Sequence, residues 1–199
     1  MFTHYLVLIG LLSFAAGTVI LGRWLRKNQT ISDAERSSRI MHFLFFAGLI
    51  APPIVGIFYP GLTHFDELVG LQSLPWKPLF LVLGILFAIP GLYFMGITNK
   101  LLRALGSGTN AFILTKKIVN DDIYKRTRNP MSLGFYLSVL AVAFAFSSTF
   151  VLLAVCLGLI PAHIFFLKYF EELELELRFG ESYLEYKKSV PFLIPKSAH

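Results

Sequence analysis

Two adjacent carboxylates, Glu171 and Glu172, stand where a long apolar run gives way to a charged tail. Lys168 lies just before them, and His163 lies within the apolar run itself. Carboxylates can act as general bases, and an ionisable residue inside a membrane span indicates a functional site. The alternatives are a solvated pair of glutamates and a neutral His163 that hydrogen-bonds to a neighbouring helix. The sequence leaves these alternatives open.

A basic connector is the second group of residues that could do chemistry, and it ends Asp122-Ile-Tyr-Lys-Arg-Thr-Arg-Asn-Pro130. From Met131 to Leu167 no Asp, Glu, Lys or Arg occurs. This stretch is too long for one membrane span of about 20 residues and has the length of two. Two spans form a hairpin, so the connector and the acidic tail leave the membrane on the same side. We therefore expect the site at this edge of the bilayer.

Composition indicates a membrane protein and argues against two other classes. The chain is 55% hydrophobic and only 15% charged, whereas about a quarter of a soluble domain is charged. The net charge of +6 in so apolar a chain reflects cytoplasmic loops rather than nucleic-acid binding. No metal site is expected, because Cys156 is the single cysteine and the five histidines show no paired-ligand spacing.

The continuously apolar runs predict an all-α integral membrane protein, a single membrane domain over residues 1–199, with five transmembrane helices. Ser147-Ser148-Thr149 is the expected turn of the C-terminal helical hairpin. The predicted spans are residues 5–21, 40–58, 78–97, 131–146 and 150–167, with a cofactor connector over 99–130 and a cytoplasmic amphipathic tail over 168–199.

The tail is expected to be helical, because it is built from strong helix formers without β-branched residues. The fifth helix should continue to about Phe179 and end at Gly180. A second short helix should carry Tyr183 and Tyr186 on one face and stop before Pro191. For Glu174 and Glu176 a solvated acidic face is predicted.

Loop charges predict the orientation. Lys and Arg are concentrated in residues 23–39 and 99–130, whereas residues 59–77 contain only Lys77. The positive-inside rule then places the N-terminus outside and the C-terminus in the cytoplasm.

A series of residues follows one order around the predicted hairpin: Tyr124-x-x-x-Arg128-Asn-Pro130-x-x-x-Gly134, Glu171-Glu172, Phe179-Gly180, Tyr183, Tyr186 and Val190-Pro191. In this series the C-terminal half resembles the isoprenylcysteine carboxyl methyltransferase family, and the related membrane phospholipid methyltransferases share much of the pattern. The resemblance covers about residues 115–195. The chain departs from the family at Asn129, where the family usually has His, and at Leu167 and Lys168, where it usually has Arg shortly before the glutamate pair.

The resemblance implies methyl transfer from S-adenosyl-L-methionine, with S-adenosyl-L-homocysteine as product, at the cytoplasmic end of the bundle. It implies a catalytic role for Glu171 and substrate binding by Glu171, Lys168 and His163. The implied cofactor-binding residues are Lys116, Lys117, Ile118, Val119, Tyr124, Asn129, Pro130, Met131, Ser132 and Glu172.

The implied partners are the lipid bilayer and a lipidic substrate that enters sideways from the membrane. A prenylcysteine carboxylate is the first expected acceptor and a phospholipid amine the second. A carboxylate is ionised at neutral pH, whereas an amine arrives protonated and needs a base such as Glu171 or Glu172. Two other classes stay open: a nicotinamide-dependent sterol-type reductase and a non-enzymatic transporter or membrane scaffold.

Overall fold

The computed structural model describes residues 2–59, 61–62, 64–105 and 114–196. All regular elements in these ranges are helices, so the predicted all-α class is confirmed. Residues 106–113 of the predicted connector and 197–199 of the predicted tail lie outside the described residues.

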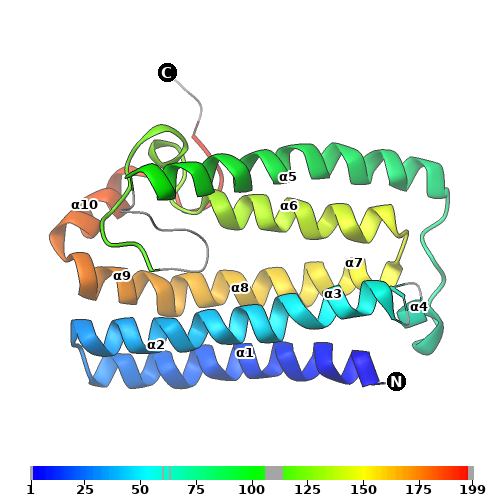
Figure 1. The fold of residues 1–199 in the computed structure, drawn as a ribbon, viewed down its shortest axis with the longest axis horizontal. Helices are drawn as coiled ribbons and strands as arrows, with labels where there is room; N and C mark the ends of the chain where they lie inside the picture. The colour runs from blue at the N-terminus through cyan, green and yellow to red at the C-terminus, as the bar shows by residue number, and fades with distance from the viewer. Residues whose placement is uncertain (1, 60, 63, 106–113, 197–199) are drawn as a thin grey trace.

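The first two long helices pair along one side of the molecule (Figure 1). The first is α1 (Phe2–Lys27), and the second is continuous through α2 (Ile31–Leu44), the π-helical segment η1 (Phe45–Ile50) and α3 (Ala51–Phe58). The second helix begins well before the predicted start at residue 40. The reason is a cap, because the Thr30 hydroxyl accepts a hydrogen bond from the Asp33 N–H at 3.1 Å.

Helices α5 (Lys77–Leu105) and α6 (Pro130–Ala145) form the opposite side of the molecule (Figure 1). They pack very closely because glycines meet at the contact. A Cβ built on Gly134 would lie 2.8 Å from the carbonyl oxygen of Gly91, closer than a side chain can approach. Small residues at such a crossing let two membrane helices approach backbone to backbone.

A further long helix, named the third long helix because α5 and α6 form one side together, runs without a break over residues 149–179. It lies between the two sides. Ser148 caps its start, and the π-helical segment η3 ends two residues before Pro161, which has no N–H to donate to the preceding turn. Its parts are α7 (Thr149–Leu153), η3 (Ala154–Leu159), α8 (Ile160–Phe166), the π-helical segment η4 (Leu167–Glu171) and α9 (Glu172–Phe179).

The connector and the tail fold together at one end of the bundle (Figure 1). The connector contains the 3₁₀ turn η2 (Asp122–Lys125). After α9, Gly180 takes a φ of 55°, a left-handed value that favours glycine, and the chain turns into α10 (Glu181–Ser189). These helix ends coincide with the ones that the sequence predicts.

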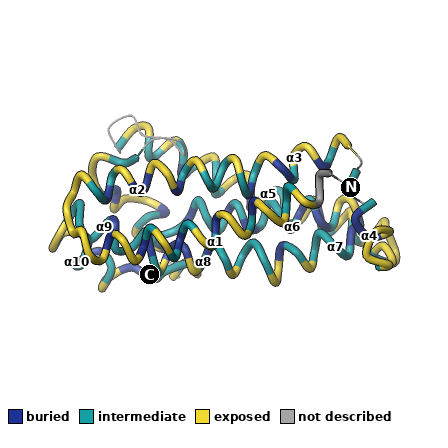
Figure 2. Tube along the Cα trace, turned by 90° about the horizontal axis from the view of Figure 1, so that it is seen from below, coloured by how far each residue is buried: buried dark blue, intermediate teal, exposed yellow. Residues whose placement is uncertain are grey.

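The short helix α4 (His64–Leu68) lies at the opposite end of the bundle, beside α7 (Figure 1). Within the described ranges, four helices have the length and composition to cross a membrane: Tyr5–Lys27, Ile31–Phe58, Lys77–Leu105 and Thr149–Phe179. Helix α6 is apolar but shorter, at 16 residues. Exposed positions recur along the whole length of the helices (Figure 2), as expected for surfaces that face lipid.

Candidate functional site

A cavity of about 620 Å³ runs along the third long helix, between α1–α3 on one side and α5–α6 on the other. One face of this helix lines it from end to end, because the lining positions recur three or four residues apart. They are Phe150, Val151, Ala154, Val155, Leu159, His163, Phe166, Leu167, Glu171, Glu174, Leu175, Arg178 and Phe179.

The cavity is apolar toward α4 and polar toward the tail. Leu49, Leu62, Phe65 and Val142 are among the residues that line its apolar part. The polar end is lined by Tyr124, Arg128, Asn129, Glu171, Glu174 and Arg178. A ligand with an apolar body and a charged or polar end matches this distribution.

Hydrogen bonds between the connector and the tail build the polar end. The Tyr186 hydroxyl donates to the Tyr124 carbonyl at 2.8 Å. The Arg128 N–H donates to the Pro191 carbonyl at 2.9 Å, and the Asn129 side-chain amide donates to the Phe192 carbonyl at 2.9 Å. Two segments far apart in the sequence are thus held as one wall.

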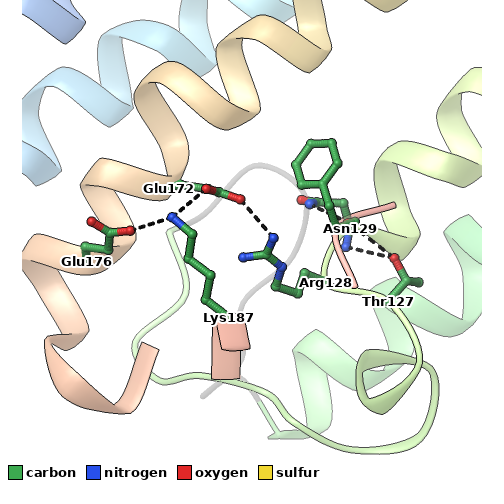
Figure 3. A network of polar contacts seen from close by, with 7 residues as sticks. Thr127, Arg128, Asn129, Glu172, Glu176 and Lys187 are labelled. Carbon is green, nitrogen blue, oxygen red and sulfur yellow. Dashed lines mark hydrogen bonds and ion pairs between the residues drawn. The ribbon is translucent and has the colours of Figure 1, made fainter. Parts of the chain in front are cut away.

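An ion network ties the same wall to α9 (Figure 3). An Arg128 Nη lies 3.2 Å from a Glu172 carboxylate oxygen, and the Lys187 Nζ lies 2.7 Å from Glu172 and 2.7 Å from Glu176. Burial alone would lower the pKa of Lys187, but its hydrogen bonds to Glu172 and Glu176 raise the pKa above the ordinary value. Lys187 therefore stays charged and bridges the two carboxylates.

A second ion pair lies deeper in the polar end. The Arg178 Nη1 lies 2.6 Å from the Glu174 Oε1, and the two side chains are only 6% and 3% exposed. Arg178 also donates to the Thr115 carbonyl, which anchors the connector to α9. The sequence-based prediction of a solvated face for Glu174 is wrong, because this buried arginine supplies the missing partner.

Glu171 differs from both of its acidic neighbours. It lines the cavity, and no hydrogen bond or ion pair among the described residues reaches its carboxylate. Glu172 is balanced by Arg128 and Lys187, and Glu174 by Arg178. The uncompensated carboxylate at this wall is therefore suited to a cationic ligand or to accepting a proton.

Arg128 contributes the opposite kind of group. Its side chain is 10% exposed and it lines the cavity, yet its Nε and its Nη1 are buried without a hydrogen-bond acceptor among the described residues. A buried guanidinium donor without an acceptor costs free energy. An anionic ligand group would accept hydrogen bonds from both the Nε and the Nη1 of Arg128.

His163 has a partner within the bundle. The Tyr136 hydroxyl of α6 and the His163 Nδ1 of α8 are 2.8 Å apart and buried. Phe14, Phe45 and Phe166 surround the imidazole ring. This contact to a neighbouring helix is one of the two sequence-based alternatives for His163, and the residue lines the cavity as well.

The tyrosines of the connector and the tail are held in their neutral form. Burial, then the neighbouring Tyr186 and Glu171, raise the pKa of Tyr124 above its ordinary value. Burial also raises the pKa of Tyr186, against a smaller opposing effect of Arg128. Both phenols therefore remain hydrogen-bond donors throughout the physiological pH range.

Ten of the residues proposed from the sequence line the cavity, and three do not. Lys116 is exposed, the Lys168 Nζ lies 4.8 Å from the centre of the Phe192 ring, and Glu172 is in the ion network. The lining residues are Lys117, Ile118, Val119, Tyr124, Asn129, Pro130, Met131, Ser132, His163 and Glu171.

Sequence reasoning missed Arg128, Glu174 and Arg178 as lining residues of this end. The only signal for Arg128 was its place in the Arg-Asn-Pro motif. Arg178 gave the signal of a cation four residues after Glu174 on a helix, a spacing that brings side chains together. Among the described residues, no group of three or more His, Cys, Asp and Glu side chains is arranged to hold a metal ion.

Comparison with known proteins gives one finding. A family model described as phospholipid methyltransferase matches residues 79–182, which is more than half of the chain. The match includes most of α5, the connector, α6 and the whole third long helix, and it ends in α10. No curated protein and no solved structure matches the chain.

Proposed function

The chain belongs to the phospholipid methyltransferase family, and on that premise we propose that it is an S-adenosyl-L-methionine-dependent enzyme that methylates the amine headgroup of a membrane lipid. Members of the family are membrane methyltransferases. The observation that carries the proposal for the acceptor is the Glu171 carboxylate, which no described residue pairs with and which lies where the apolar cavity meets the polar connector and tail.

The residues at the polar end suit an S-adenosyl cofactor. The buried, unsatisfied Nε and Nη1 of Arg128 match its carboxylate, and the apolar side chains of Ile118, Val119 and Met131 offer contacts to its uncharged parts. When bound, S-adenosyl-L-methionine supplies a methyl group carried by a positively charged sulfur. Connector and tail residues would hold it, with Tyr124, Asn129, Pro130 and Ser132 among the lining.

The chain's own chemistry centres on Glu171. A lipid amine reaches the site as an ammonium ion, which an uncompensated carboxylate attracts. The Glu171 carboxylate then accepts the ammonium proton, which leaves a neutral amine with a free electron pair. The apolar helices that surround the cavity exclude water and orient the headgroup through its acyl chain.

A carboxylate acceptor is the second candidate, because the sequence resembles the prenylcysteine enzymes. Arg128 supports it, since its two unsatisfied donors could hold an acceptor carboxylate. The nearby Glu171 disfavours it, because a second negative charge beside an uncompensated carboxylate is repelled. We therefore place the amine first.

We also propose that all five predicted spans cross the membrane, with the N-terminus outside and the C-terminus in the cytoplasm. The loop charges support this orientation. Helix α6 is about 24 Å long at 1.5 Å per residue, somewhat less than the ~30 Å hydrocarbon core. Local thinning of the bilayer accommodates a short span at modest cost.

The experiment has two arms on the detergent-purified protein. Calorimetry compares S-adenosyl-L-homocysteine with a reduced nicotinamide, and binding of the nicotinamide alone would contradict a methyltransferase. Mass spectrometry then follows methylation of phosphatidylethanolamine and of a farnesyl-cysteine analogue. We expect the phospholipid to be methylated, with a rate that climbs with pH as the amine loses its proton. Methylation of the farnesyl analogue alone, with a flat profile from about pH 6 to 8, would favour the carboxylate.

A further inference from the structure

The cavity ends, on the side away from Glu171, against three apolar side chains. Leu62 and Phe65 come from the segment around α4, and Phe150 comes from α7. The Phe65 and Phe150 rings stack, with centroids 5.4 Å apart and planes 9° apart. Phe65 is 3% exposed, so most of its surface is packed against neighbouring side chains. These side chains form a floor at this end of the cavity.

Hydrogen bonds fix this floor to the turn between α6 and α7. The Phe150 N–H donates to the buried Asp66 carboxylate at 2.5 Å. The Leu74 N–H donates to the Ser147 carbonyl at 2.8 Å, and the Thr149 hydroxyl donates to the Gln72 carbonyl at 2.7 Å. The segment between α3 and α5 is thereby tied to the membrane bundle at several points, and the floor has a defined position.

The same helix carries both ends of the cavity. Phe150 and Glu171 lie on one continuous helix, so they are separated by about 30 Å along its axis at 1.5 Å per residue. Apolar side chains such as Leu11, Leu49 and Val142 line the space between them. An apolar space of this length that is charged at one end suits a linear chain rather than a broad ring system.

We infer that the cavity takes one acyl chain of the acceptor lipid and that Phe65 and Phe150 limit the length of this chain. The inference rests on the proposed function, because the headgroup of the same lipid is placed at Glu171. Every methylene that fits between headgroup and floor adds buried apolar area. A chain longer than the cavity must bend or leave its end outside, so it gains nothing further.

Chain-length competition tests this inference without cofactor or turnover. Lysophosphatidylethanolamines with saturated chains of increasing length compete in pairs for the purified protein, and native mass spectrometry gives the ratio bound. Each added methylene should increase binding about fourfold (about 0.8 kcal/mol) until the chain reaches the floor, where the gain stops.

Two substitutions of Phe65 should shift, in opposite directions, the chain length at which binding ceases to increase. We expect Phe65→Ala to shift it to longer chains and Phe65→Trp to shorter ones. Phe58→Ala is the matched control, because Phe58 is 83% exposed and does not line the cavity. Should Phe65→Ala fail to fold, the shift toward shorter chains in Phe65→Trp still decides the matter.

The inference would be overturned if binding ceased to increase at the same chain length in the native protein and in the Phe65 variants. It would also be overturned if binding to the native protein kept increasing with chain length. The result is separable from the proposed function. If the protein methylates phosphatidylethanolamine but the limiting chain length is the same in all variants, the proposed function stands and the length limit is wrong. If the protein methylates no lipid but the limiting chain length changes with Phe65, the length limit stands and the proposed function is wrong.

Discussion

Three glutamates lie close together at the polar end of the cavity, and they differ in what balances their charge. Glu172 and Glu174 have cationic partners, whereas no described residue pairs with Glu171. A cationic partner makes a carboxylate a weaker base than it would be unpaired, because the cation stabilises the charged form. The chemistry proposed for the site is therefore assigned to one of the three.

Glu171→Gln should lower the methylation rate by about 10²–10⁴-fold near neutral pH, the usual contribution of a general base. The loss should shrink at higher pH, because more of the amine is then neutral without help. Initial rates from pH 7 to pH 10 measure this. Glu181→Gln, on an exposed residue of α10, is the control. An undiminished rate in Glu171→Gln would assign the proton transfer to another group.

Arg128→Lys should weaken binding of S-adenosyl-L-homocysteine by about 1–3 kcal/mol, because the charge remains but the planar fork of donors is lost. Isothermal calorimetry measures the change. Arg126→Lys makes the same substitution two residues away on an exposed side chain and should leave the affinity unaltered. Equal affinities in all three proteins would place the cofactor carboxylate away from Arg128.

Side-chain pairing is the part of the site that the sequence could not predict. The Glu171-Glu172 pair and the connector motif were recognisable from their order, and most of the residues they implied line one cavity. Which glutamate stays unpaired depends on where Lys187 and Arg178 point, and these directions follow from the turn at Gly180 and from the anchoring of the connector. The Glu174–Arg178 pair has a local signal in its spacing of four residues, whereas the contacts of Lys187 with Glu172 and Glu176 join two helices and have none.

The helices themselves were largely predictable, because apolar runs of membrane length have few other ways to satisfy their backbone groups. The ends of the apolar runs were not the ends of the helices. Helix α1 continues through its basic residues to Lys27, and α2 begins at the Thr30 cap, since helix and apolar stretch need not coincide outside the membrane. The π-helical segments also have no signature in the hydrophobic pattern.

Gly134→Ala should separate α5 from α6 and destabilise the protein by about 1–3 kcal/mol, the usual result of overpacking. Its Cβ would meet the Gly91 carbonyl, which cannot move aside. Thermal unfolding in detergent measures the effect. Gly96→Ala is the matched control on α5, since nothing lies within 4 Å of a Cβ built there. Equal melting temperatures for the two variants would contradict the tight crossing.

The contact between connector and tail should weaken at alkaline pH. A phenol with a pKa above its ordinary value in the folded protein stabilises the fold below about pH 10, and this stability is lost as the pH rises beyond that point. Tyr186→Phe removes both the phenol and its bond to Tyr124. We expect the variant to be less stable at pH 8 and to lose less stability between pH 8 and pH 11. Parallel losses in both proteins would assign the alkaline effect elsewhere.

At the scale of the whole molecule, the number of crossings decides on which side of the membrane the site lies. Single cysteines introduced by Val69→Cys and Lys188→Cys, in a Cys156→Ala background, test this with a membrane-impermeant reagent in intact cells. Both are exposed positions. We expect labelling at residue 69 from outside, and at residue 188 only after permeabilisation. If α6 failed to cross, the two positions would lie on the same side.

The π-helical segment η4 ends at Glu171, and this has a consequence for the angular phase of the third long helix. Each residue of an α-helix advances the next by about 100°. A π-helical turn holds an additional residue, so deleting one residue within η4 would restore an α-helical turn and leave the two flanking parts of the helix nearly in phase. The face with His163 and Phe150 would then stay continuous with the face of Glu174 and Arg178. At this one turn the helix could therefore lose a residue and still keep its apolar channel aligned with its charged end.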